Sequence, residues 1–428
     1  IQLIYPVYIT EDISKIAKDY FKENNILSNA GKEVPVVAVG KLGYPDLAEQ
    51  ALRDEKCDMV MLGRPLLADP DWPNKVYSGR VNEIIPCIGC HEGCINEFVE
   101  GGHPQCAVNP RTSFEYIMPH NLIPAKEKKK IGVIGAGPAG VNMAITAAKR
   151  GHDVTLVEES GRVGGKTIQG SVPKIKYEIA NYRRYLEDQV IKAQEAENFT
   201  YLPNTTATID WLKDQKFDSI VFAMGTKDSN LPFKGLDKVN SIEATDLLLH
   251  PEKIGEAKKA VVVGGGVVGC ETAYWLSYEH NLDVKVVEME KYFMNHTCTA
   301  NRGHLLHYME KAGVELLNCT RVTGFEENAV KVMQNISESV PDPYITWHPV
   351  LPENVVNPLE PKFEVKEEEK ILNADLVVIA TGGKPKDHLF YEVQKENIAP
   401  ELYNIGDSFS GGKVLEATRA ANALGRRI

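Results

Sequence analysis

The pattern of apolar and polar residues changes along the chain. In residues 1–80, apolar positions at helical spacing predict helices at 11–24 and 45–54, and short apolar runs predict buried strands at 34–39 and 59–62. From residue 131 a buried strand, a glycine turn, a helix and a second strand follow one another, and the same order returns from residue 260. Two such units about 130 residues apart predict two dinucleotide-binding domains.

Composition and charge narrow the class of protein. Of the 428 residues, 43% are hydrophobic and 25% are charged, and no apolar run approaches the roughly 20 residues that a bilayer span requires. Lys and Arg number 48 against 59 Asp and Glu, and the net charge of −11 offers no general attraction to nucleic acid or anionic membranes. We therefore expect a cytoplasmic protein that acts on a small molecule, with no nucleic-acid or membrane partner.

Four of the eight cysteines cluster in one short segment. Cys87, Cys90, Cys94 and Cys106 have the spacing C-x2-C-x3-C-x11-C. Four thiolates suit either zinc or an iron–sulfur cluster, and unligated core cysteines are the third interpretation. We favour a 4Fe-4S cluster because flavin-type motifs follow downstream and the three-residue gap disfavours the paired knuckles of a zinc ribbon. His91 lies inside the loop, but four cysteines already complete a ligand set.

The first glycine motif comprises Gly135, Gly137 and Gly140, with Glu158 at the end of the second strand. Such glycines let a pyrophosphate approach the helix N-terminus, and the carboxylate can bind ribose hydroxyls. FAD is the favoured dinucleotide because Gly165 and Lys166 follow soon after Glu158, and an NIGD segment at 404–407 precedes the final helix. The further residues that we expect to contact it are Ala139, Gly165, Lys166, Gly382, Gly406 and Asp407.

The second glycine motif comprises Gly264, Gly266 and Gly269, followed by Glu288. No arginine follows Glu288 directly, and its carboxylate would repel a 2′-phosphate, so NADH is favoured over NADPH. The basic residues His296, Arg302 and His304 lie further along and offer the alternative source of positive charge. Two short segments, at 222–226 and 379–383, are expected to cross between the two nucleotide domains as hinges.

Basic residues follow both strands of the first 80 residues. Lys41 comes after the first strand, and Gly63 and Arg64 come after the second. Such positions form the usual phosphate site when the strands are the last two of a (β/α)8 barrel. Surface charge is the alternative interpretation, and on local sequence alone it is the better one.

Taken together, these motifs resemble those of the family that contains 2,4-dienoyl-CoA reductase, enoate reductase and trimethylamine dehydrogenase, the multidomain relatives of old yellow enzyme. The segments that carry the resemblance are VPVVAVGKL, MVMLGRPLLADPDWPNK, CIGCHEGC, CAVNPR, GAGPAG, GGGVVGCETA and NIGD. The resemblance implies four parts, all of α/β class apart from the cluster segment. They are the end of an FMN-binding (β/α)8 barrel (1–80), a 4Fe-4S segment (81–125), an FAD domain (126–229 and 371–428) and an inserted NAD(H) domain (230–370).

The resemblance also implies an activity. Electrons would pass from NADH through FAD and the cluster to FMN, which would reduce the activated C=C bond of an enoate or enoyl-CoA. Family members have six further barrel strands that carry the FMN ring contacts and the proton donor, so no catalytic residue is named. We expect the chain to be a fragment of a longer protein. The alternatives are a partner chain that supplies the rest of the barrel, and assembly as a homo-oligomer.

Two other functions use the same motifs. The chain could serve as an electron-transfer module without substrate chemistry, or it could follow the trimethylamine dehydrogenase branch, where ADP is a structural ligand and an amine is oxidised. The intact second glycine motif with Glu288 argues against the amine branch. The motifs do not separate the reductase from the electron-transfer module.

Overall fold

The computed structural model describes residues 5–99, 101–229, 233–295, 297–346 and 362–428, together with residues 355 and 358. Of the proline-rich insert at 336–363, which the sequence predicts as an extended hairpin or surface excursion, residues 347–354, 356, 357 and 359–361 lie outside these ranges. Within the described ranges, no helix has both the length and the apolar character needed to cross a bilayer.

The first part of the chain forms two parallel βα units. The strands β1 (Val37–Val39) and β2 (Met59–Met61) pair in parallel, and the helices α1 (Tyr5–Glu23) and α2 (Pro45–Arg53) accompany them. Both helices and both strands were predicted, although α1 begins six residues earlier than expected. The strands are not buried as predicted: Val37, Val39, Met59 and Met61 are exposed, because only one face of this two-stranded sheet, through Ala38 and Val60, packs on the segment. Two short helices complete this part and lead to the cysteines: α3 (Arg64–Ala68) and α4 (Trp72–Tyr77).

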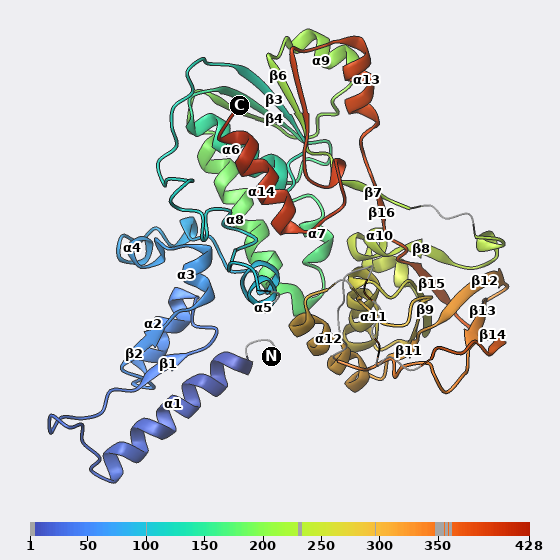
Figure 1. Cartoon of the computed structure of the whole chain (residues 1–428), viewed down its shortest axis with the longest axis horizontal. Coiled ribbons are helices and arrows are strands. Elements are labelled where there is room, and N and C mark those ends of the chain that lie inside the picture. Colours follow the sequence, from blue (N-terminus) through green and yellow to red (C-terminus); the bar gives the residue numbers. More distant parts are fainter. Residues whose placement is uncertain are drawn as a thin grey trace.

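The first five-stranded sheet is entirely parallel, with the order β17-β6-β3-β4-β5. Its strands are β3 (Lys130–Ile134), β4 (Asp153–Val157), β5 (Phe199–Leu202), β6 (Ser219–Phe222) and β17 (Glu401–Asn404). One face packs on α6 (Pro138–Lys149), α8 (Tyr177–Ala193) and α14 (Val414–Gly425), and the other on α9 (Ile209–Gln215) and α13 (His388–Glu396). Cover on both faces explains why β6 is buried along its whole length (Figure 1).

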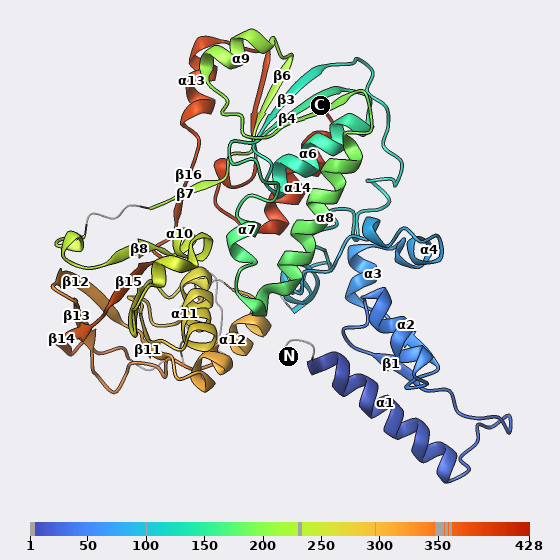
Figure 2. The same cartoon turned by 180° about the vertical axis from the view of Figure 1, so that it is seen from behind.

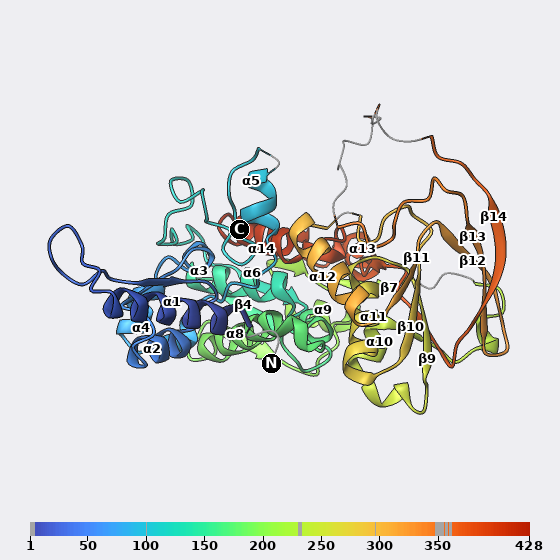
Figure 3. The same cartoon turned by 90° about the horizontal axis from the view of Figure 1, so that it is seen from below.

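A second parallel sheet has the order β11-β10-β9-β15-β8. Its strands are β8 (Ser241–Glu243), β9 (Lys259–Val263), β10 (Asp283–Val287), β11 (Glu315–Leu317) and β15 (Leu376–Ile379). Helices α10 (Ala244–Leu249), α11 (Val267–His280) and α12 (Thr299–Lys311) cover one face. An antiparallel sheet of β12 (Thr320–Glu326), β13 (Ala329–Asn335) and β14 (Glu367–Asn373) covers the other face and forms the outermost layer in Figure 3.

The two domains are joined by a pair of short antiparallel strands. β7 (Thr226–Asp228) and β16 (Gly383–Pro385) run side by side between the sheets in Figures 1 and 2. They follow the two crossings predicted from the sequence. The second domain extends beyond the expected boundary at residue 370, because β15 pairs with β9 and therefore belongs to the second sheet.

The packing of the first glycine turn against α6 gives a testable expectation. A Cβ on Gly140 would lie 1.8 Å from the carbonyl oxygen of Gly135, so Gly140→Ala must move the helix away from the turn. We expect a loss of about 2–3 kcal/mol in the free energy of unfolding, measured as a lower thermal midpoint. Gly170→Ala is the control, since its Cβ meets no atom within 4 Å. Equal midpoints for Gly140→Ala and the unaltered chain would contradict this packing.

Candidate functional site

The four clustered cysteines line one small cavity. Cys87, Cys90, Cys94 and Cys106 come together although the last lies twelve residues beyond the third. Gly89 and His91 adopt positive φ angles of 62° and 59°, which turn the chain tightly between the first three cysteines. We call residues 87–109 the cysteine loop; residue 100 is outside the described part.

The four sulfurs are the donor set of either a zinc ion or an iron–sulfur cluster, because both bind four thiolates. Among the described residues, no group of three or more His, Cys, Asp or Glu side chains is arranged to hold a metal ion. The four thiols line a cavity.

Burial and backbone hydrogen bonds set the properties of these thiols. Desolvation raises the pKa of all four, that of Cys90 to about 12 and that of Cys106 to about 11. Backbone groups of the loop oppose this shift by hydrogen bonding to the sulfurs; among them are Gly89 at Cys87, Glu92 at Cys90, and Val108 and Asn109 at Cys106. Hydrogen bonds to sulfur are one of the means by which proteins tune iron–sulfur clusters. The residues present therefore fit such a group.

The cysteine loop is fixed to the first nucleotide domain through α14. The hydroxyl of Thr418 donates to the carbonyl oxygen of Ala107 at 2.6 Å, and Lys413 forms an ion pair with Glu92 at 2.8 Å. Lys413 precedes the first residue of α14 and lies six residues after Asp407, one of the residues predicted to contact FAD. The loop thus meets the end of the first domain at which the dinucleotide is expected.

The first glycine turn has the geometry that a dinucleotide requires. Gly135 has a φ of 105°, and a Cβ there would lie 2.4 Å from the carbonyl oxygen of Ala223. Gly137 precedes the first residue of α6, where a Cβ would meet only a glycine Cα, at 3.8 Å, so the helix N-terminus is open. Glu158 is 8% exposed, and its Oε2 accepts from the Ala136 amide at 2.9 Å. A carboxylate and a helix N-terminus thus stand side by side, as in sites for ribose and pyrophosphate.

The second glycine turn repeats this geometry. Gly264 has a φ of 108° and packs against the Ala380 carbonyl, as Gly135 packs against Ala223. Gly266 precedes α11 with open space around its Cα, and Gly269 packs against the turn. Glu288 accepts from the Gly265 amide at 2.6 Å through Oε2 and from the Glu290 amide at 2.8 Å through Oε1. Thr381, beside the turn, has a buried hydroxyl without a hydrogen-bond partner in the described structure, so a polar group of a ligand would complete it.

The remaining residues predicted for FAD lie around the first turn or at the crossing. A Cβ on Gly165 would approach the Cα of Gly137 to 2.9 Å, and Gly406 packs against the side chain of Ala139. Lys166 lies 3.8 Å from Asp228 of β7. Gly382 has a φ of 92° at the start of β16.

Asp407 begins the turn before α14. Burial raises the pKa of its carboxyl group, whereas the amide of Gly412, 3.1 Å away, and the charge of Lys166 oppose that shift. Asp407 and Lys166 therefore act on the same part of the predicted site.

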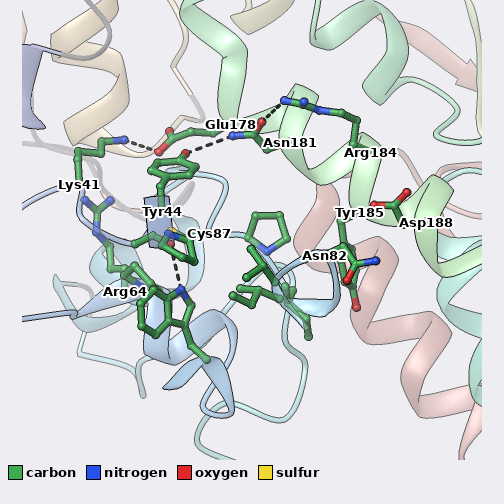
Figure 4. Close-up of a pocket in the computed structure, with 18 residues that line it drawn as sticks. Lys41, Tyr44, Arg64, Asn82, Cys87, Glu178, Asn181, Arg184, Tyr185 and Asp188 are labelled. Carbon is green, nitrogen blue, oxygen red and sulfur yellow. Dashed lines mark hydrogen bonds and ion pairs between the residues drawn. The ribbon is translucent and has the colours of Figure 1, made fainter. Parts of the chain in front are cut away.

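The two predicted phosphate-binding side chains line one cavity but are both engaged by protein groups. Lys41 forms an ion pair with Glu178 of α8 (Figure 4). Arg64 contacts Nε2 of His91. Burial alone would lower the pKa of Lys41, but the carboxylate of Glu178 outweighs it and the pKa is raised. The cavity measures about 350 Å³ and also contacts Cys87. Gly63, before α3, has open space around its Cα, so backbone groups remain available to a phosphate.

Sequence reasoning missed the partners that join separate parts of the chain. Glu178 and Lys413 belong to no motif, and Glu92 lies within CIGCHEGC but was given no role. These residues meet their partners across as many as 321 residues. Of the basic residues proposed as an alternative phosphate site, Arg302 is buried and donates to the carbonyl oxygen of Phe293 at 2.8 Å, whereas His296 lies outside the described residues. The side chain of Arg302 thus lies in the interior of the second domain.

Comparisons with known proteins agree with this arrangement. Residues 129–402 match the family described as pyridine nucleotide-disulphide oxidoreductase, and residues 5–83 match the NADH:flavin oxidoreductase / NADH oxidase family. The chain is 30% identical to a cinnamate reductase of Clostridium sporogenes and to an NADH oxidase of Thermoanaerobacter brockii. Each alignment covers 96% of this chain, and 55% and 56% of the respective relative. The chain thus spans about half the length of these curated relatives.

A solved structure extends the likeness to three dimensions. A 2-naphthoyl-CoA reductase in complex with 2-naphthoyl-CoA superposes with a TM-score of 0.81 at 28% identity, over 96% of this chain and 56% of that one. The fold is therefore the end of a flavin barrel joined to two Rossmann-like domains. The chain belongs to the pyridine nucleotide-disulphide oxidoreductase family, in the branch of flavin-barrel enzymes that contains the enoate and dienoyl-CoA reductases.

Proposed function

We propose that this chain is the electron-input part of an NADH-dependent reductase of activated C=C bonds. When bound, NADH would supply a hydride to FAD, and the 4Fe-4S cluster would carry its two electrons singly to FMN for reduction of an enoate or enoyl-CoA. Relatives named cinnamate reductase and 2-naphthoyl-CoA reductase support a conjugated acid or thioester as the substrate class.

The observation that carries this proposal is the position of the cysteine loop. Through Glu92 and Ala107 it is bound to α14, at the end of the first domain where Asp407 lies. Through His91 it contacts Arg64, in the barrel segment. Four partly buried thiols therefore stand between the expected FAD site and the expected FMN phosphate site, which is the order that electron transfer from one flavin to the other requires.

The residues of the two glycine turns would bind and orient the nucleotides. Glu158 and Glu288 each present a carboxylate beside a helix N-terminus, and each is itself fixed by a backbone amide of its turn. A fixed carboxylate accepts hydrogen bonds from ribose hydroxyls without first having to be ordered.

The proposal is tested by the cofactor content of anaerobically prepared chain. We expect one FAD per chain on release and chromatography, and bleaching of its visible absorbance on addition of NADH. Release of ADP without FAD would contradict the proposal and would instead favour the amine dehydrogenase branch.

Replacing any one of Cys87, Cys90, Cys94 or Cys106 by Ser should remove the cluster. A serine oxygen is a poor substitute for a thiolate ligand of iron, so we expect iron and acid-labile sulfide to fall together. Cys319→Ser is the matched control, because Cys319 is also partly buried but lies outside the cysteine loop. Zinc without iron or sulfide in the unaltered protein would show that the cluster assignment is wrong.

The side chain of Glu288 should set the choice of nicotinamide nucleotide. A 2′-phosphate would meet its carboxylate at short range, so we expect bound FAD to be reduced on the order of 100-fold faster by NADH than by NADPH in stopped flow. Glu288→Ala should narrow this gap by weakening NADH and relieving the repulsion of NADPH. Glu310→Gln, an exposed carboxylate on α12, should leave the gap unchanged. NADPH as the faster donor to the unaltered chain would contradict this role of Glu288.

A further inference from the structure

A single side chain of the second domain holds the cysteine loop at two points. Asn301, in the first turn of α12, donates from Nδ2 to the carbonyl oxygen of Cys90 at 2.7 Å. Its Oδ1 lies 2.8 Å from Nδ1 of His91. Both ends of one amide are thus used on two consecutive residues of the loop, some 210 residues away in the sequence.

The hydrogen bonds around His91 have one direction. Arginine can only donate, so Arg64 donates to Nε2 of His91, and the ring proton must then be on Nδ1, which donates to Asn301. Burial lowers the pKa of His91, which agrees with a neutral ring. The hydrogen bonds therefore all point the same way: Arg64 donates to His91, His91 donates to Asn301, and Asn301 donates to the carbonyl oxygen of Cys90. No acceptor in this series faces another acceptor.

The other side of α12 is connected to the second glycine turn. The amide of Met294 donates to the carbonyl oxygen of Gly265 at 2.8 Å, and the ring of Phe293 packs so closely on Gly265 that a Cβ there would lie 2.3 Å from it. The carbonyl oxygen of Phe293 in turn accepts from Nε of Arg302, which is 2% exposed and directly follows Asn301. A series of contacts therefore connects the second glycine turn to the cysteine loop. It runs from Gly265 through Phe293, Arg302 and Asn301 to Cys90, by packing, hydrogen bonds and the peptide bond between Asn301 and Arg302.

We propose that Asn301 is a positioning residue through which nucleotide binding at the second glycine turn restrains the cysteine loop. The inference rests on the proposed function, because it requires that the turn bind NAD(H). A nucleotide that orders Gly265 also orders Phe293, and with it the start of α12. Asn301 then holds the carbonyl of Cys90 and the ring of His91 in place, next to the sulfurs that would carry electrons.

The test is hydrogen–deuterium exchange of the whole chain with and without saturating NAD+. In the unaltered protein we expect NAD+ to slow exchange in residues 260–270 and, on the order of 10-fold, in residues 88–96. In Asn301→Leu, NAD+ should still protect 260–270 but should no longer affect 88–96. The near-isosteric Asn301→Asp keeps the acceptor for His91 but places a carboxylate oxygen against the carbonyl oxygen of Cys90. It should therefore also lose most of the response of residues 88–96, and it guards against misfolding of the leucine variant.

A control variant distinguishes the effect of Asn301 from a general weakening of the contacts between the two nucleotide domains. Lys176 of the first domain forms an ion pair with Glu271 of α11 at 2.5 Å, a contact between the same two domains that does not involve the cysteine loop. Lys176→Met should keep the response of residues 88–96 to NAD+. If NAD+ protects 260–270 but not 88–96 in the unaltered protein, or if Asn301→Leu keeps the response, the role of Asn301 is refuted. If NAD+ protects neither segment, the proposed nucleotide site itself is wrong.

Discussion

The partial burial of four thiols where three parts of the chain meet is the constraint on which the rest of the structure depends. A buried thiol resists ionisation, as the raised pKa values of Cys90 and Cys106 show, yet only the thiolate binds metal. A loop with four such groups is stable with its charges only if metal compensates them. Contacts from Thr418, Lys413, Arg64 and Asn301 hold the loop where such a group would adjoin both proposed flavin sites.

The two nucleotide domains hold a carboxylate beside their glycine turn in the same way. In each, a carboxylate at the end of a strand is held by a backbone amide of the adjoining glycine turn, at 2.9 Å for Glu158 and 2.6 Å for Glu288. Each turn also packs against the carbonyl of the residue that directly follows a neighbouring strand, Ala223 after β6 or Ala380 after β15, and the chain crosses between the domains just after each of these. A nucleotide bound at either turn would therefore lie close to a crossing strand.

Local sequence patterns predicted most of this fold because helices, buried strands and glycine turns depend on residues that are close together in the sequence. Buried parallel strands are continuous apolar runs, and a glycine turn such as that at Gly135 needs its residue types at fixed spacing, so both domains and the hinge crossings were found. The end of the second domain was misplaced because β15 is an apolar strand that either sheet could accept. The partners of Lys41 and Arg64 escaped prediction for another reason: Glu178 and His91 meet them only through tertiary packing, and no local pattern marks such contacts.

We propose that the cysteine loop carries electrons that enter at the second nucleotide domain. This is tested by mixing the anaerobic chain with NADH, freezing it at intervals and recording low-temperature electron paramagnetic resonance spectra. The signal of a reduced iron–sulfur cluster should grow as the flavin absorbance bleaches. Bleaching of the flavin without any cluster signal, in protein that contains iron and sulfide, would contradict this proposal.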